Sequence, residues 1–207
     1  MTPAGYEDLV RLLPPPEVEV VCPPWDEIES ALGFRLPSDY RWFCDTYGGG
    51  SIRNGASRAD FEIFAPVSAP ASSCTAGLAG LRGYHMGGFH EAFTYDGADE
   101  EMWNGAPYSV YPEPGGVLGW GMSEWGDSFF WLMRGEDPNV WPVVAWMRDP
   151  AEAFTLDCGF VEFLRRIVTG EFPWTPNWAG PDVHWLMRND WKGGGLAVTA
   201  GPAPSEM

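Results

Sequence analysis

Residues 25–50 read WDEIESALGFRLPSDYRWFCDTYGGG. This stretch predicts two short helices, because its apolar residues recur at the spacing of one helical face. They are Trp25, Ile28 and Leu32 in the first helix, then Tyr40, Phe43, Cys44 and Tyr47 in the second. Gly33 suits the end of the first helix, where a positive φ is needed, and Pro37 suits the start of the second, where no backbone N–H is required. Three glycines, residues 48–50, then end the hairpin and lead into a strand that begins at Ile52.

Two further helices and four further strands are predicted around this hairpin. The helices cover Pro3–Leu13 and Cys158–Thr169, and Asp157 is in position to cap the second of them. Pro142 marks either an edge strand or the start of a strand, because proline cannot donate a sheet hydrogen bond. The continuous apolar run after Ser128 indicates a strand buried on both faces. The predicted strands are Phe61–Phe64, Val117–Gly121, Ser128–Met133 and Trp141–Met147.

These elements predict a single α+β domain, in which helices near both ends of the chain flank a mostly antiparallel sheet. Residues 1–24 hold the first helix and a proline-rich lead, and residues 25–172 form the α+β domain. The tryptophan-rich residues 173–191 are expected to pack on the domain surface as an appendage. The glycine- and alanine-rich residues 192–207 are expected to form a disordered tail.

The charge of the chain favours some partners over others. The 207 residues include 29 acidic and 12 basic ones, which gives a net charge of −17. Nucleic acid is disfavoured as a ligand, because phosphate binding needs clustered Lys and Arg. A basic protein partner is favoured, although solubility alone also explains an acidic chain. We expect a cytoplasmic location, since the sequence shows neither a long apolar run nor the pattern of a signal peptide.

Cysteine and histidine positions argue against a metal site. His85 and His90 are five residues apart, His184 is distant from both, and neither arrangement has the spacing of a common metal motif. The cysteines form no close pair in the sequence, and we expect free thiols in a reducing compartment. They are Cys22, Cys44, Cys74 and Cys158. The sequence therefore predicts no metal ligand and no cofactor.

Carboxylates are the remaining candidates for catalysis. Glu124 and Asp127 could form an acid–base pair. Asp127, however, stands between a glycine and a serine, a context more typical of an aspartate that bonds the backbone of its own turn. We therefore expect that the protein is not an enzyme.

One acidic and aromatic region stands out as a possible binding surface. Between Tyr84 and Asn139 there are ten acidic residues and one basic residue, Arg134, with tyrosines and tryptophans interleaved. Acidic groups steer a cationic partner, and aromatic side chains anchor an interface. The alternative is a solvated loop whose aromatic residues lie in the core. The predicted partner-binding residues are Asp96, Asp99, Glu100, Glu101, Trp103, Glu124, Trp125 and Asp127.

Several motifs resemble the SUKH superfamily of Smi/Knr-type domains. The matching residues are Trp25, Ile28, Glu29, Leu32, Gly33, Leu36–Tyr40, Phe43 and Tyr47–Gly49, then Leu118–Gly121, Gly126, Asp127 and Phe129–Trp131, and finally Phe160, Phe163, Leu164, Ile167, Gly170 and Glu171. The resemblance implies an α+β domain over roughly Trp25 to Phe172. It also implies a binding role, because bacterial members of this family mostly bind and silence a toxin and eukaryotic members are regulatory and scaffold-like.

Charge, aromatic content and resemblance lead to one functional hypothesis and one rival. The hypothesis is a non-enzymatic immunity protein that blocks a basic, nuclease-like toxin by covering its active site. The rival is a regulatory or scaffold module that binds a cellular protein. A tight, stoichiometric companion that is itself toxic would favour the first, and a housekeeping complex would favour the second.

The acidic loop provides a first prediction. Reversing Asp96, Asp99, Glu100 and Glu101 to lysine should slow association with a basic partner, because steering charges act mainly on the on-rate. Trp103→Ala should instead speed dissociation, since it removes an anchor. Binding kinetics at two salt concentrations measure both effects, with circular dichroism as the folding control. Unchanged association of the folded charge-reversal variant would exclude this loop from the interface.

Overall fold

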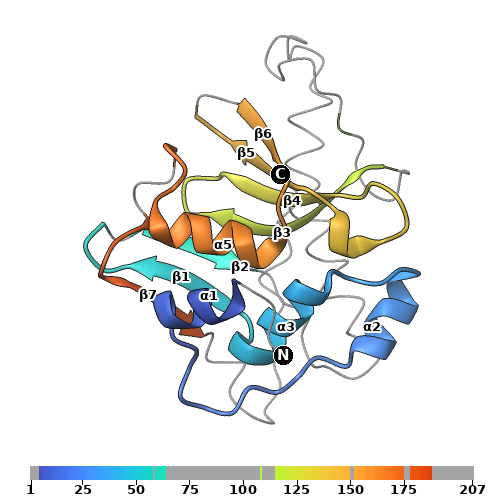
Figure 1. Cartoon of the computed structure of the whole chain (residues 1–207), viewed down its shortest axis with the longest axis horizontal. Coiled ribbons are helices and arrows are strands. Elements are labelled where there is room, and N and C mark those ends of the chain that lie inside the picture. The colour runs from blue at the N-terminus through green and yellow to red at the C-terminus, as the bar shows by residue number, and fades with distance from the viewer. Residues whose placement is uncertain are drawn as a thin grey trace, which may run out of the picture.

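The computed structural model describes residues 5–57, 59–63, 108, 115–149, 152–174 and 178–187. Within them, helices pack against one sheet, so the fold is α+β, as predicted (Figure 1). The helices are α1 (Tyr6–Leu12), α2 (Trp25–Leu32), α3 (Ser38–Tyr47) and α5 (Phe160–Thr169), with a short 3-10 helix η2 (Pro138–Val140). The strands are β1 (Gly50–Asn54), β2 (Ala59–Ile63), β3 (Val117–Ser123), β4 (Ser128–Leu132), β5 (Val143–Met147), β6 (Glu152–Leu156) and β7 (Val183–Met187).

The sheet is antiparallel between all neighbouring strands. Its order is β6-β5-β4-β3-β2-β1-β7, so β1 to β6 follow the chain and β7 returns to pair with β1. Consecutive antiparallel strands are joined at alternating ends of a sheet. The β3–β4 turn and the β5–β6 turn therefore lie at the same end, and this is the end that carries the candidate site.

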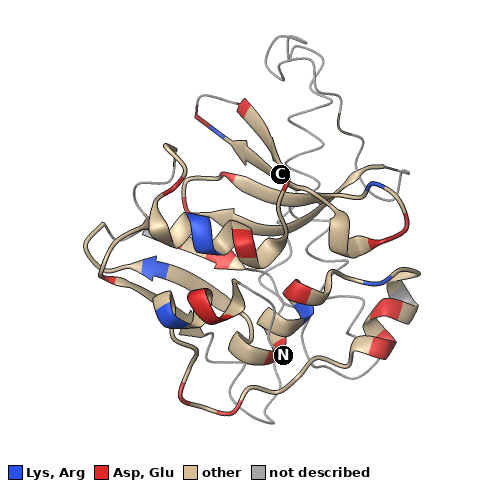
Figure 2. Ribbon diagram, viewed as in Figure 1, with Lys and Arg blue, Asp and Glu red and all other residues tan. Residues whose placement is uncertain are grey.

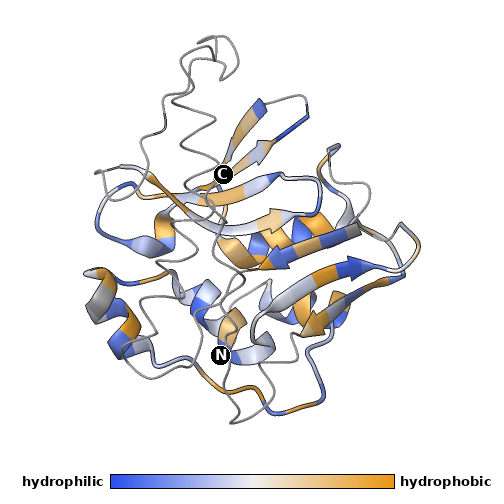
Figure 3. Cartoon of the chain, turned by 180° about the vertical axis from the view of Figure 1, so that it is seen from behind, coloured by the Kyte–Doolittle hydropathy of each residue, from blue (hydrophilic) through white to orange (hydrophobic). Residues whose placement is uncertain are grey.

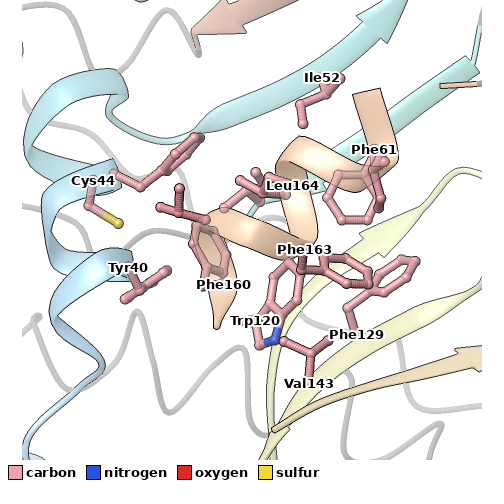
Figure 4. Close-up of a cluster of buried hydrophobic side chains, with 14 of the residues drawn as sticks. Tyr40, Cys44, Ile52, Phe61, Trp120, Phe129, Val143, Phe160, Phe163 and Leu164 are labelled. Carbon is pink, nitrogen blue, oxygen red and sulfur yellow. The ribbon is translucent and has the colours of Figure 1, made fainter. Parts of the chain in front are cut away.

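Helices α1, α3 and α5 cover one face of the sheet and contribute to the core. Figure 4 shows aromatic and aliphatic side chains of α3, α5 and the strands packed together in this core. Phe160 and Phe163 of α5 meet Trp120 of β3 edge to face, with ring centroids 4.8 and 5.5 Å apart. Tyr40 of α3 also meets Phe160, at 5.2 Å, so two helices share one aromatic layer. The apolar residues predicted from the helical hairpin are all buried, namely Trp25, Ile28, Leu32, Tyr40, Phe43, Cys44 and Tyr47.

Strand β4 is buried on both faces, which confirms the prediction from its apolar run. Phe129 and Trp131 belong to the core beneath the helices. Phe130 and Leu132 are also buried, and because side chains alternate along a strand they lie on the opposite face. Figure 3 shows the sheet from that side, with α5 behind the strands.

The carboxylate of Asp39 links the N-terminal ends of two helices. Its Oδ1 accepts a hydrogen bond of 2.8 Å from the backbone N–H of Tyr40 in α3, and its Oδ2 accepts one of 3.1 Å from Val161 in α5. Burial raises the pKa of Asp39, although these backbone donors lower it. Gly159 precedes α5, and a Cβ there would lie 2.7 Å from Asp39 Oδ2, so only glycine leaves room for the contact.

The prediction that Asp157 caps this helix is therefore wrong. The helix begins at Phe160, its N-cap residue is Gly159, and that residue makes no side-chain capping bond. Asp39, far away in the sequence, provides the acceptor instead. The free N–H groups at the start of a helix can donate to any well-placed carboxylate. The sequence alone points only to carboxylates that are close along the chain.

The C-terminal part of the sheet also differs from expectation. Neither β6 nor β7 was predicted, and residues 173–191 supply β7 to the sheet instead of packing only on its surface. Pro142 directly precedes β5, which pairs on both sides, so it marks a strand start and not an edge. The tail at 192–207 lies outside the described residues. Cys22, Cys44 and Cys158 are free thiols, as predicted.

The capping geometry predicts that Asp39→Ala destabilises the domain much more than Asp157→Ala. Loss of the Asp39 carboxylate leaves two helix N–H groups without an acceptor, which costs about 1–3 kcal/mol in the free energy of unfolding. Asp157 is exposed, and its replacement is the matched control, with an expected change below about 0.5 kcal/mol. Urea denaturation followed by tryptophan fluorescence measures both. Equal losses would contradict the role assigned to Asp39.

Candidate functional site

The β3–β4 turn is organised by hydrogen bonds of Ser123 and Asp127. The Oγ of Ser123 donates to Asp127 Oδ2 at 2.7 Å and accepts from the backbone N–H groups of Asp127 and Trp125 at 3.1 and 3.2 Å. Gly126 has a φ of 90°, a conformation that glycine adopts without strain. The N–H of Arg148 donates to Asp127 Oδ1 at 2.9 Å, which ties the β5–β6 turn to the β3–β4 turn.

Asp127 is consequently part of the scaffold of the site. Its side chain is 5% exposed, and both of its carboxylate oxygens accept hydrogen bonds within the two turns. This matches the alternative that the sequence context favoured, an aspartate that forms a turn. Ser123 and Arg148 already donate hydrogen bonds to its two carboxylate oxygens. Asp127 would therefore influence a partner by holding the turn in shape.

Trp125 is the residue that this turn presents to solvent. Its side chain is 44% exposed, and its ring stacks on Trp178 with centroids 5.9 Å apart and planes inclined by 26°. Trp178 is buried and meets Phe61 at 5.3 Å and Phe129 at 6.1 Å. The exposed ring is thus anchored to the core through one buried tryptophan, which limits its freedom before any partner arrives.

A hollow of about 440 Å³ opens beside this ring. We call it the tryptophan hollow, and its lining residues are Trp125, Asp127, Met147, Arg148, Asp149, Trp174 and Trp178. They come from the two turns and from the segment after α5. Trp174 is held in place by Phe172, with ring centroids 4.8 Å apart, and by Phe154, at 5.7 Å. The volume of the tryptophan hollow lies within the range of pockets that bind small molecules.

The two turns that line the tryptophan hollow carry both acidic and basic residues, and the ribbon in Figure 2 is coloured by residue charge. Arg148 and Asp149 are exposed on the β5–β6 turn, and Glu124 is exposed on the β3–β4 turn. The Arg148 side chain lies against Gly126, and its Nη1 donates a long bond of 3.5 Å to the carbonyl of Trp125. Within the described residues, neither Asp149 nor Glu124 forms an ion pair. Both carboxylates are therefore available to a partner.

The structure brings together part of the predicted surface. Glu124 and Trp125 lie side by side on the exposed turn, with Asp127 beneath them. The other predicted residues fall outside the described part of the chain, and they are Asp96, Asp99, Glu100, Glu101 and Trp103.

The sequence did not point to five residues of the hollow, which are Arg148, Asp149, Met147, Trp174 and Trp178. One signal could have found the first two. The strands predicted at 117–121, 128–133 and 141–147 form a meander, and the turn after its third strand returns to the end where its first strand stops.

Two features are absent from the described residues, namely a cluster of metal-ligating side chains and a helix able to cross a membrane. Within these ranges, no three His, Cys, Asp or Glu side chains gather in a way that could hold a metal ion. None of the helices in this part of the chain has both the length and the apolar content needed to cross a membrane.

The sequence profile of the SMI1 / KNR4 family (SUKH-1) matches residues 24–166. The chain belongs to the SUKH-1 family. No curated protein and no solved structure gives a significant match to the chain. The SUKH-1 match runs from the start of α2 into α5 and contains both turns of the site. Trp174 and Trp178 follow the matched region, so this SUKH-1 chain completes its hollow with residues beyond the family match.

The turn geometry predicts that Ser123→Ala destabilises the domain. The substitution removes one hydroxyl that makes three hydrogen bonds and leaves the buried Asp127 carboxylate short of a donor. We expect a loss of about 1–3 kcal/mol in the free energy of unfolding. Ser128→Ala, five residues along, is the matched control, with an expected change below about 0.5 kcal/mol. Chemical denaturation compares the two, and a stability of Ser123→Ala equal to that of the control would contradict the role assigned to this hydroxyl.

Proposed function

We propose that this SUKH-1 chain is a non-enzymatic immunity protein of the cytoplasm, which neutralises a basic, nuclease-like toxin by covering its active site. Membership of the family supports a binding role, and a net charge of −17 supports a basic partner. In this proposal, acidic side chains take the place of the toxin's anionic substrate, and the bound domain blocks access to the catalytic groups.

The observation that carries the proposal is the exposed ring of Trp125 on a preformed turn. Tryptophan is among the residues that contribute most to binding when it is buried at the centre of an interface. A ring that is already held by Trp178 and by the hydrogen bonds of Ser123 loses little conformational entropy on binding. An exposed and rigid tryptophan beside free carboxylates is therefore suited to anchor a cationic protein.

The wider surface supplies the second requirement, which is electrostatic attraction. Exposed acidic residues line the N-terminal part of the chain (Figure 2). Glu17 and Glu19 lie in the lead between α1 and α2, and Asp26 and Glu27 lie in the first turn of α2. None of these four carboxylates forms an ion pair within the described residues. Charges of this kind act over several ångströms and raise the rate of encounter with a basic partner.

Affinity capture with matched variants tests the proposal. The tagged chain should retain a stoichiometric, basic polypeptide that arrests growth when it is expressed alone and is harmless when the chain is co-expressed. Trp125→Ala should weaken binding of this polypeptide about 30-fold, as the loss of an interface anchor does, and should abolish protection. Leu186→Ala is the control, because this leucine on β7 is 43% exposed, close to the 44% of Trp125.

Three results would contradict the proposal. A companion that is harmless when expressed alone would indicate a regulatory or scaffold module. Turnover of a small molecule without any companion would indicate an enzyme. Full binding and protection by a folded Trp125→Ala variant would remove this turn from the interface.

A further inference from the structure

We propose that the tryptophan hollow is a socket for an arginine side chain of the partner. This inference rests on the proposed function, because it names the group through which a basic polypeptide would dock. It concerns the region between Trp125 on the β3–β4 turn, Asp149 on the β5–β6 turn and Trp174 after α5.

The aromatic walls favour a planar cation. A guanidinium group stacks on an indole face and is attracted by its negative π-cloud. The ring of Trp125 is only partly covered, so it offers the face on which a guanidinium could stack. Trp174 also lines the hollow, and its own ring is stacked on the rings of Phe172 and Phe154. The same preference operates elsewhere in this chain, where the guanidinium carbon of Arg41 lies 5.2 Å from the ring centroid of Trp25.

The carboxylates favour a positive charge at the mouth of the hollow. Asp149 is exposed, lines the hollow and forms no ion pair within the described residues. Glu124 stands next to Trp125 on the same turn. A carboxylate binds an arginine through two parallel hydrogen bonds, which a lysine cannot reproduce.

Arg148 allows a test of whether the hollow prefers a positively or a negatively charged group. Arg148 also lines the hollow, and its positive charge would repel an arginine and attract an acidic group. Two carboxylates, Asp127 and Asp149, line the hollow against this one cation, so the lining side chains carry a net negative charge. Removing the Arg148 side chain leaves its backbone bond to Asp127 intact, and the shape of the turn should persist.

The experiment titrates the protein with single amino acids and needs no partner. The probes are the acetylated amides of arginine, lysine and glutamate, and the signal is the indole ¹H–¹⁵N resonance of Trp125, assigned with Trp125→Phe. Arginine should shift this resonance saturably, lysine should bind more weakly, and glutamate should leave it unchanged. Asp149→Asn should weaken arginine binding about threefold to tenfold, and Arg148→Met should strengthen it by a similar factor. Asp26→Asn, on α2, is the control and should leave the affinity unchanged.

Several results would overturn the inference. They are a silent Trp125 resonance with arginine, equal binding of lysine, stronger binding of glutamate, or weaker arginine binding by Arg148→Met. The titration and the capture experiment can fail independently of each other. An arginine site in a chain that captures no basic polypeptide would contradict the proposed function alone. A captured toxin with a silent titration would contradict this inference alone.

Discussion

The carboxylate of Asp39 joins the N-terminal ends of α3 and α5, and the placement of the helical layer depends on this contact. One oxygen serves each helix, so the two helices cannot shift independently without losing a hydrogen bond. The contact sets α5 on the sheet, where Phe163 packs against both Trp120 and Phe172. Only Pro173 separates Phe172 from Trp174, so the position of α5 also sets one wall of the tryptophan hollow.

A short series of aromatic ring contacts connects the hydrophobic core to the candidate site. Phe61 and Phe129 hold Trp178 in the core, and Trp178 supports the exposed ring of Trp125. The hydrogen bonds of Asp127 fix the backbone around that ring from the other side. A rigid surface of this kind binds with little entropic cost, which is the property that an inhibitor acting by occlusion requires. The same rigidity means that substitutions in the core are expected to affect binding as well as stability.

Sequence reasoning succeeded where local residues determine structure. The helix from Trp25 to Leu32 follows from apolar spacing and from Gly33, whose φ is 79°. It failed where a residue or strand interacts with one that is far away along the chain. The cap of α5 comes from a residue 122 positions away from Val161, and β7 is recognisable only once β1 is there to pair with it. For the same reason the sequence predicted Glu124 and Trp125 as binding residues but not Trp174, whose place in the hollow depends on the packing of α5.

Amide hydrogen exchange of the chain, free and bound to its captured partner, tests whether the two turns form the interface. If they do, exchange should be slower in the complex at residues 124–126 and 148–149, with little change in α5, whose amides are already protected by the core. Slower exchange confined to α1, α2 and the lead between them, with both turns unchanged, would contradict this interface.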